Sequence, residues 1–358
     1  MLPVIHSDTQ GLCAHIVQNR HFQGVRALNS SDLRVAIVGC GGIAGLHISA
    51  IQEAGGARIV AVADCAEQAA RAAGDRTGAK VYTDYDDMLA REQPDAVVVA
   101  TPPNSHRGLT MAALEAGAHV LCEKPLALNS FEAEEMVEAA RAGGRLLITA
   151  FCHRFHEPVM KAKELIESGE LGPIVMFRNR FGGKVDMSST WFGSREIAGG
   201  GLLMDTAVHS IDLFRYLVGE VRNVSARTLY FNPSMSVEDT AIMLLESTAG
   251  VIGTIEGSWA TPASANVIEV YGHSGAAFVD YADGLRYFTE SAGDWIRPEM
   301  SKPDRFVLQM EHFLNCIREG KQPIVTGEDG LAAMKVIEAA YRSVERGCFE
   351  PPEITTEE

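Results

Sequence analysis

From Leu33 onward, continuous apolar runs alternate with segments in which apolar residues recur every three or four positions. The run at 34–39 is rich in β-branched residues, which is typical of a parallel strand buried on both faces. Similar runs, separated by helix-like segments, lie at 57–64, 95–101, 119–124 and 145–151. Repeated β–α units with short connections predict an α/β domain built on a doubly wound parallel sheet over residues 32–152.

The pattern changes after about residue 172, where short strand-like segments follow one another with only turns between them. Direct succession of strands predicts antiparallel hairpins, and hence an α+β domain over 153–358 with a large, mostly antiparallel open sheet. Two helices are expected near the end, separated at Pro323, and they could pack back onto the first domain. Thr326 and Asp329 are spaced as a capping box for the second helix. Residues 1–31 precede the first strand and are interpreted as an N-terminal extension.

Composition narrows the class of protein. The 358 residues carry a formal net charge of -16, which argues against a nucleic-acid partner because phosphate binding needs clustered Lys and Arg. The seven cysteines are scattered and include no Cys-x-x-Cys pair, a pattern typical of a reducing compartment, so a cytoplasmic protein is expected. No apolar run approaches the ~20 residues needed to span a bilayer, so no membrane partner is expected.

A glycine-rich turn follows the first strand and opens the first helix. The spacing Gly39-x-Gly41-x-x-Ala44 fits the dinucleotide fingerprint of a Rossmann domain in its Gly/Ala form. The first glycine permits the tight turn, the second allows close approach of a pyrophosphate, and the helix start supplies N–H groups to it. The residues predicted to hold the dinucleotide at this turn are Gly39, Gly41, Gly42, Ile43 and Ala44.

Asp64 ends the second strand, where an acidic side chain in this fold binds the ribose hydroxyls. The two residues after it, Cys65 and Ala66, offer no cation for a 2′-phosphate, so NAD is favoured over NADP as the cofactor. Asp64 could also serve as the N-cap of the next helix, and the two roles are compatible.

The fourth strand leads into the turn Thr101-Pro102-Pro103-Asn104-Ser105-His106 at the edge of the sheet where ligands bind. Thr101, Pro102, Asn104 and His106 are predicted to contact the cofactor. For Asn104 and His106, ordinary turn chemistry or helix capping is an equally simple explanation.

An apolar helix is predicted after Gly199-Gly200-Gly201, yet it carries Asp205, His209 and Asp212 at spacings of four and three. These spacings place the three side chains on one helical face, as a polar stripe on an otherwise apolar helix. A satisfied structural pair or a metal site are alternatives. No further His, Asp or Glu cluster completes a coordination shell in the sequence, so no metal is predicted.

Glu123-Lys124-Pro125 closes a buried strand at the same sheet edge. Together with the glycine fingerprint, the 101–106 turn and the Gly199–Asp212 segment, this motif resembles the glucose–fructose oxidoreductase/inositol dehydrogenase/MocA (Gfo/Idh/MocA) family, over residues 33–347. The resemblance implies an NAD-dependent dehydrogenase that oxidises a hydroxyl of a sugar, sugar derivative or cyclitol by hydride transfer. An NADP-dependent sugar ketoreductase and a non-catalytic dinucleotide-binding regulator are the alternatives.

The resemblance also implies roles for individual residues. Lys124 is expected beside the reacting hydroxyl, His209 is expected to accept its proton, and Asp205 is expected to orient His209 or to bind a substrate hydroxyl. These three are the predicted catalytic residues, and they are expected to bind substrate together with Arg154. Glu123 is expected to steady the turn or the cofactor ribose.

Two further expectations come from the resemblance. Trp191 is expected near the nicotinamide end of the cofactor, followed by Phe192 where the family often has Arg; that contact is then lost or moved to Arg195. Family members commonly pair through the open sheet face, so a homodimer or homotetramer is expected from the strands after residue 222.

Overall fold

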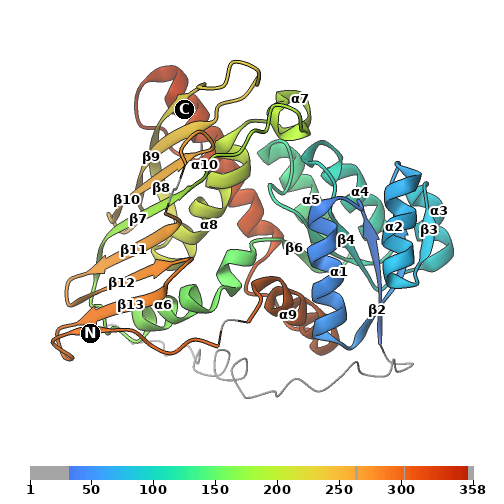
Figure 1. Ribbon diagram of the computed structural model, residues 1–358, viewed down its shortest axis with the longest axis horizontal. Helices are drawn as coiled ribbons and strands as arrows, with labels where there is room; N and C mark the ends of the chain where they lie inside the picture. The colour runs from blue at the N-terminus through green and yellow to red at the C-terminus, as the bar shows by residue number, and fades with distance from the viewer. Residues whose placement is uncertain (1–31, 263–264, 302, 354–358) are drawn as a thin grey trace.

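The computed structural model describes residues 32–262, 265–301 and 303–353 and contains two sheets (Figure 1). The interpretation of residues 1–31 as an extension lies outside this described part. The first sheet has six parallel strands in the order β3-β2-β1-β4-β5-β6. Its strands are β1 (Leu33–Val38), β2 (Ala57–Ala63), β3 (Lys80–Tyr82), β4 (Ala96–Val99), β5 (His119–Cys122) and β6 (Leu147–Thr149).

Helices connect these strands and cover both faces of the sheet. They are α1 (Gly42–Ala54), α2 (Glu67–Thr77), α3 (Tyr85–Glu92), α4 (Pro103–Glu115) and α5 (Ser130–Ala142). All four residues of β4 are fully buried, which explains why the strands appear as unbroken apolar runs in the sequence. The predicted doubly wound Rossmann sheet is confirmed.

The second sheet has eight strands in the order β14-β13-β12-β11-β7-β10-β9-β8. They are β7 (Ile174–Gly182), β8 (Val221–Leu229), β9 (Thr240–Ser247), β10 (Ile252–Ser258), β11 (Val267–Gly272), β12 (Gly275–Asp280), β13 (Gly284–Thr289) and β14 (Trp295–Ile296). Only β7 and β10 pair in parallel; the other neighbours are antiparallel, which confirms the predicted mostly antiparallel sheet.

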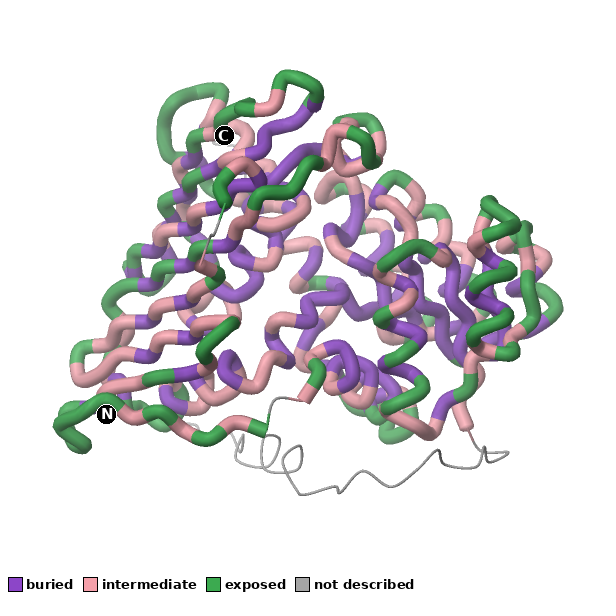
Figure 2. Tube along the Cα trace, viewed as in Figure 1, coloured by how far each residue is buried: buried purple, intermediate pink, exposed green. Residues whose placement is uncertain are grey.

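Helical segments lie between β6 and β8. They are the 3₁₀ turn η1 (Cys152–Phe155), α6 (Glu157–Glu167), the 3₁₀ turn η2 (Trp191–Gly193), α7 (Arg195–Ala198), the π-helical turn η3 (Leu203–Ala207) and α8 (Val208–Leu217). Helices α6 and α8 pack on the inner face of the second sheet. The outer face is open: along β9, Ala241, Met243 and Leu245 are buried, whereas Ile242 and Leu244 are exposed (Figure 2).

Two C-terminal helices join the domains. Helix α9 (Arg305–Glu319) packs against α1, and α10 (Gly327–Arg346) contacts α5 and β6 of the first domain as well as α8 and β8 of the second. The predicted capping box of α10 is confirmed: Thr326 Oγ1 accepts a hydrogen bond from Asp329 N, and Asp329 Oδ2 accepts one from Thr326 N. None of the described helices combines the length and the apolar character needed to cross a membrane.

Candidate active site

The turn between β1 and α1 is shaped to receive an anion. Gly39 has a φ of 85°, and a Cβ there would lie 2.5 Å from the carbonyl oxygen of Ala100, so only glycine fits. A Cβ at Gly41 or Gly42 would meet nothing within 4 Å, which leaves open space above the turn. No side chain caps the start of α1 and its first turn holds no acidic residue, so this helix N-terminus fits a pyrophosphate.

The carboxylate of Asp64 holds this turn from the next strand. Its Oδ2 accepts a hydrogen bond of 2.7 Å from Cys40 N, and its Oδ1 accepts one of 2.8 Å from Ala66 N before α2 begins. Asp64 therefore braces the glycine turn, a role that the sequence did not suggest. Because a carboxylate can accept about four hydrogen bonds, these two leave capacity for the ribose hydroxyls.

The turn after β4 contains one correction. His106 is fully buried, and its two ring nitrogens face the carbonyl oxygens of Thr101 and Pro125 at 2.8 and 2.9 Å. The expectation that His106 contacts the cofactor is therefore wrong; its side chain instead ties the 101–106 turn to the turn after β5. Asn104 is exposed and Thr101 and Pro102 are half-buried, so these three remain available to a ligand.

Lys124 and Asp205 meet across the two domains. Lys124 Nζ donates to Asp205 Oδ1 at 2.6 Å and to the main-chain oxygen of Asp205 at 2.9 Å. The other carboxylate oxygen of Asp205 accepts from Thr206 Oγ1, which in turn accepts from Trp259 Nε1. Burial lowers the pKa of Lys124, but the facing Asp205 carboxylate outweighs it and the pKa is raised overall. Lys124 is therefore held as an ammonium group.

Glu123, next to Lys124 in the chain, is held by His47, a residue for which no role was predicted. Its Oε1 lies 2.7 Å from Nε2 of the fully buried His47, and its Oε2 accepts from Lys124 N at 3.2 Å. Burial alone would raise the pKa of Glu123, but His47 and Lys124 lower it overall. His47 lies within α1 in an apolar pattern that carries no chemical signal of this role.

His209 lies beside this pair without a partner for one of its nitrogens. Its Nδ1 is buried and makes no hydrogen bond among the described residues. The ring packs edge-on against His153, with 4.4 Å between centroids, and against Phe151 at 6.1 Å. Burial, followed by the nearby His153, Lys124 and Arg305, lowers the pKa of His209 well below 6.5. The imidazole is therefore neutral near pH 7 and can accept a proton.

A second group of polar rings adjoins His209 through His153. Nδ1 of His153 lies 2.5 Å from Tyr281 Oη, and the ring of His156 stacks on Tyr281 with 4.5 Å between centroids. No role was predicted for His153, His156 or Tyr281. This tyrosine follows β12, far along the chain from η1, and nothing in the local sequence links the two.

The structure corrects the expectation for Arg154. Its side chain is buried, and the guanidinium donates to both oxygens of Asp212, to Asp329 and to the main-chain oxygen of Ile324. With its donors engaged in this way, Arg154 does not bind substrate. The adjacent His153 takes the position next to His209 instead.

Asp212 also differs from its prediction. A regular α-helix would align Asp205, His209 and Asp212, but the chain forms a π-helical turn over Leu203–Ala207 before α8 begins. Asp205 and His209 lie near Lys124, whereas Asp212 is 1% exposed and pairs with Arg154 inside the protein. The polar stripe at the site therefore contains two residues rather than the predicted three, because Asp212 pairs with the buried Arg154.

An apolar pocket lies next to Asp205 at the junction of the domains. Its walls include Pro103, Pro125, Trp191, Phe192, Met204 and Asp205. Trp191 and Phe192 stack on each other with 3.7 Å between centroids. Arg195 does not replace the missing arginine in this pocket, because its guanidinium lies over the ring of Tyr341. No group of three His, Cys, Asp or Glu side chains in the described residues could hold a metal ion.

The arrangement of a phosphate-binding turn, an ammonium–carboxylate pair and a neutral imidazole can be compared with known proteins. The model of an oxidoreductase family with an NAD-binding Rossmann fold matches residues 33–151, and the Gfo/Idh/MocA C-terminal domain matches residues 159–278. The chain belongs to the Gfo/Idh/MocA family. It is therefore an oxidoreductase with an NAD-binding Rossmann domain.

Relatives within the Gfo/Idh/MocA family span nearly the whole chain. D-glucoside 3-dehydrogenase of Escherichia coli is 30% identical, over 90% of this chain and 98% of its own length. The NAD⁺-dependent scyllo-inositol 2-dehydrogenase of Bacillus subtilis is 29% identical, over 88% of this chain and 95% of its own length. The solved structure of GenD2 from gentamicin A biosynthesis, in complex with NAD, has a TM-score of 0.82 and 29% identity, covering 92% of this chain and 99% of that one.

Proposed function

We propose that this chain oxidises a hydroxyl group of a sugar, sugar derivative or cyclitol and uses NAD as the hydride acceptor. The observation that carries the proposal is the contact between Lys124 and Asp205, which joins the ligand edge of the Rossmann sheet to the turn that precedes His209. The related glucoside and inositol dehydrogenases support the substrate class.

The protonation states suggest how the residues divide the reaction. His209, neutral because burial lowers its pKa, accepts the proton of the reacting hydroxyl. Lys124 remains an ammonium group and stabilises the oxygen as negative charge develops on it. Asp205 keeps Lys124 in place, and its Oδ2 accepts a hydrogen bond from a substrate hydroxyl. NAD, when bound, takes the hydride from the carbon that bears this oxygen.

Most of the residues proposed to hold NAD directly follow strands of the first sheet, and Trp191 comes from η2. The glycine turn would hold the pyrophosphate and Asp64 the ribose nearest to it. Trp191 lines the apolar pocket beside Asp205 together with Pro103, which belongs to the turn after β4. Glu123 directly follows β5 and precedes Lys124. The full proposed set is Gly39, Gly41, Gly42, Ile43, Ala44, Asp64, Thr101, Pro102, Asn104, Glu123, Lys124 and Trp191.

NADH formation with a panel of pentoses, hexoses, inositols and glycosides tests the proposal, with NAD and NADP assayed in parallel. We expect turnover with NAD and one substrate group, and loss of turnover in His209→Ala with NADH binding unchanged. Turnover with NADP alone would support a ketoreductase. Tight NADH binding without turnover of any substrate would instead support a regulator.

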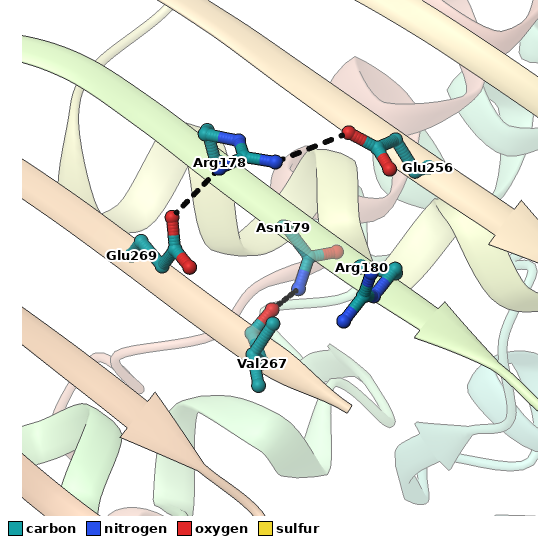
Figure 3. A pocket seen from close by; sticks show the side chains of 6 residues that line it. All are labelled: Arg178, Asn179, Arg180, Glu256, Val267 and Glu269. Carbon is teal, nitrogen blue, oxygen red and sulfur yellow. Dashed lines mark hydrogen bonds and ion pairs between the residues drawn. The ribbon is translucent and has the colours of Figure 1, made fainter. Parts of the chain in front are cut away.

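We further propose that the protein forms a homodimer or homotetramer through the open face of the second sheet. This face carries exposed apolar side chains, including Ile242, Leu244 and Ile252. Beside them, Arg178 pairs with Glu256 and Glu269 in a shallow pocket (Figure 3). A face that combines apolar residues with both signs of charge can pair with a second copy of itself.

A cytoplasmic location is also proposed. The six cysteines within the described residues are all free, as expected of a protein from a reducing compartment. Fractionation of cells that make the native chain tests this location: we expect the chain in the cytoplasmic fraction, and its recovery in another fraction would contradict the proposal.

A further inference from the structure

Glu238 binds the beginning of the helix that carries Asp205 and His209. It lies in the segment between β8 and β9 and is 1% exposed. Its Oε1 accepts hydrogen bonds from Gly201 N at 3.2 Å and Leu203 N at 3.0 Å, and its main-chain oxygen accepts from Leu202 N at 2.9 Å. Glu238 thus binds the three successive N–H groups of residues 201–203 at the helix start. The last of them lies two residues before Asp205.

Tyr341 holds Glu238 from the other side. Its hydroxyl, on α10, donates to the same Oε1 at 2.8 Å. Burial and then the neighbouring Glu238 raise the pKa of this hydroxyl, so it stays protonated and remains a donor. Among the described residues, the hydrogen-bond donors to the Glu238 side chain are all neutral. The N–H groups of Gly201 and Leu203 lie at the positive end of the helix dipole and satisfy the buried Oε1 of Glu238.

The glycines before the helix are required by these contacts. A Cβ at Gly200 would lie 2.0 Å from Tyr341 Oη, and a Cβ at Gly201 would lie 2.0 Å from the main-chain oxygen of Glu238. Side chains cannot occupy these positions without moving Glu238 or Tyr341. The glycine run therefore allows close packing of the helix start against its two anchors.

The anchored segment is an irregular one. Residues Leu203–Ala207 form a π-helical turn, which is rare and persists where surrounding contacts determine it. This turn presents both Oδ1 and the main-chain oxygen of Asp205 to Lys124 Nζ. The main-chain contact depends on the backbone position at 205, and that position follows from the anchored helix start.

We propose that Glu238, held by Tyr341, is a positioning residue for the reaction: it fixes the π-helical turn so that Asp205 meets Lys124 beside His209. This inference rests on the proposed function. Glu238 touches neither Lys124 nor Asp205 directly and acts through the backbone at 201–203.

The test compares Glu238→Ala and Glu238→Gln with the matched variant Asp239→Ala. Asp239 is equally buried but binds Phe231 N and Asn232 N in its own loop rather than the helix start. In Glu238→Ala we expect kcat to fall by about 10²-fold, since displacing a reacting group by ~1 Å has this effect. KM for NAD should remain unchanged. Glu238→Gln retains the acceptor oxygen and should restore kcat to within about threefold of the native value, whereas Asp239→Ala should lower thermal stability but not kcat.

A second measurement does not depend on turnover. Lys124 freed from Asp205 should have a lower pKa, and each unit of decrease raises the fraction of neutral amine about tenfold. Labelling of Lys124 by trinitrobenzenesulfonate, measured by peptide mass spectrometry, should therefore accelerate about tenfold in Glu238→Ala and stay unchanged in Asp239→Ala. If Glu238→Ala does not fold, Tyr341→Phe removes a single hydrogen bond and should shift both readouts in the same direction.

The outcomes separate this inference from the proposed function. If the native protein turns over no substrate but Lys124 labelling responds as expected, the proposed function fails and the positioning role stands. If kcat and Lys124 labelling are both unchanged in Glu238→Ala while its melting temperature falls as in Asp239→Ala, Glu238 is a structural residue only and the inference is overturned.

Discussion

Lys124 and His209 occupy one site, yet their surroundings move their proton affinities in opposite directions. The Asp205 carboxylate raises the pKa of Lys124 above its ordinary value, whereas burial among other rings lowers that of His209. Opposite shifts of this kind assign the acid and base roles in many enzymes. Here they identify the imidazole as the group that is free to accept a proton near neutral pH.

This assignment gives a pH dependence. The neutral form of His209 is the active one, so activity is lost as pH falls through its folded-state pKa, which lies well below 6.5. We expect kcat/KM for oxidation to stay level from neutral pH down past 6.5 and to decline only in more acid solution. A pH profile of initial rates measures this, and a midpoint near the ordinary histidine value would contradict it.

Replacement of Lys124 tests the ammonium group directly. Lys124→Met keeps most of the side-chain volume but removes the donor that faces Asp205. We expect kcat to fall by about 10²–10³-fold, the effect of losing one donor to a developing oxyanion. Lys161→Met is the control, because Lys161 pairs with Glu164 on the exposed side of α6. Equal kcat values in the two variants would show that Lys124 has no role in the reaction.

Single residues were the hardest part of the site to predict. The spacing of the fingerprint glycines placed them at the start of a helix, and the resemblance to the Gfo/Idh/MocA family pointed to Lys124 and Asp205, which lie in contact; the roles of all these residues stay predictions. His153 and Arg154 could not be distinguished, since adjacent residues in a 3₁₀ turn point in different directions and the sequence does not say which faces inward. The prediction for His106 was wrong for a related reason. A polar side chain at the ligand edge of a sheet can also turn back and bind the backbone.

At the scale of elements, the pattern of apolar segments along the chain predicted both sheets. Continuous runs gave the buried parallel strands, and the strand-to-strand succession gave the antiparallel ones. The π-helical turn could not be predicted, because it depends on Glu238, which lies 35 residues after Leu203, and on Tyr341, which lies still further along the chain. The turn changes the direction of Asp205 relative to His209 and Asp212, which both follow it in the regular helix α8.

The pair between Asp212 and Arg154 should anchor α8 to η1. Asp212→Ala leaves the buried guanidinium of Arg154 with Asp329 as its remaining carboxylate partner. Breaking a buried pair by removing one member typically costs about 3–5 kcal/mol of unfolding free energy. Urea unfolding should show a loss of this size, with Glu67→Ala, which breaks an exposed pair with Arg71, as the unchanged control. A loss too small to measure would show that the site relaxes around Arg154.

At the scale of the whole molecule, the open face of the second sheet should determine the assembly. The side chains of Ile242 and Leu244 are exposed on β9, which pairs with β10 in this sheet. Ile242→Asp combined with Leu244→Asp places two charges on this face, and burying them would oppose association. We expect light scattering to show a dimer or tetramer for the native chain and a monomer for the double variant. A native monomer would contradict the proposed assembly.

The last two helices bear on how the chain reaches this structure during synthesis. The first sheet is complete once β6 has been made, but α9 packs on α1, and α10 packs on α5 and β6. A ribosome must therefore add more than 150 further residues after β6 before these surfaces are covered. We expect the newly synthesised Rossmann domain to expose apolar surface during this time. Chaperones bind nascent chains that expose such surface. We therefore expect the first domain to become fully stable only after the last two helices have been synthesised.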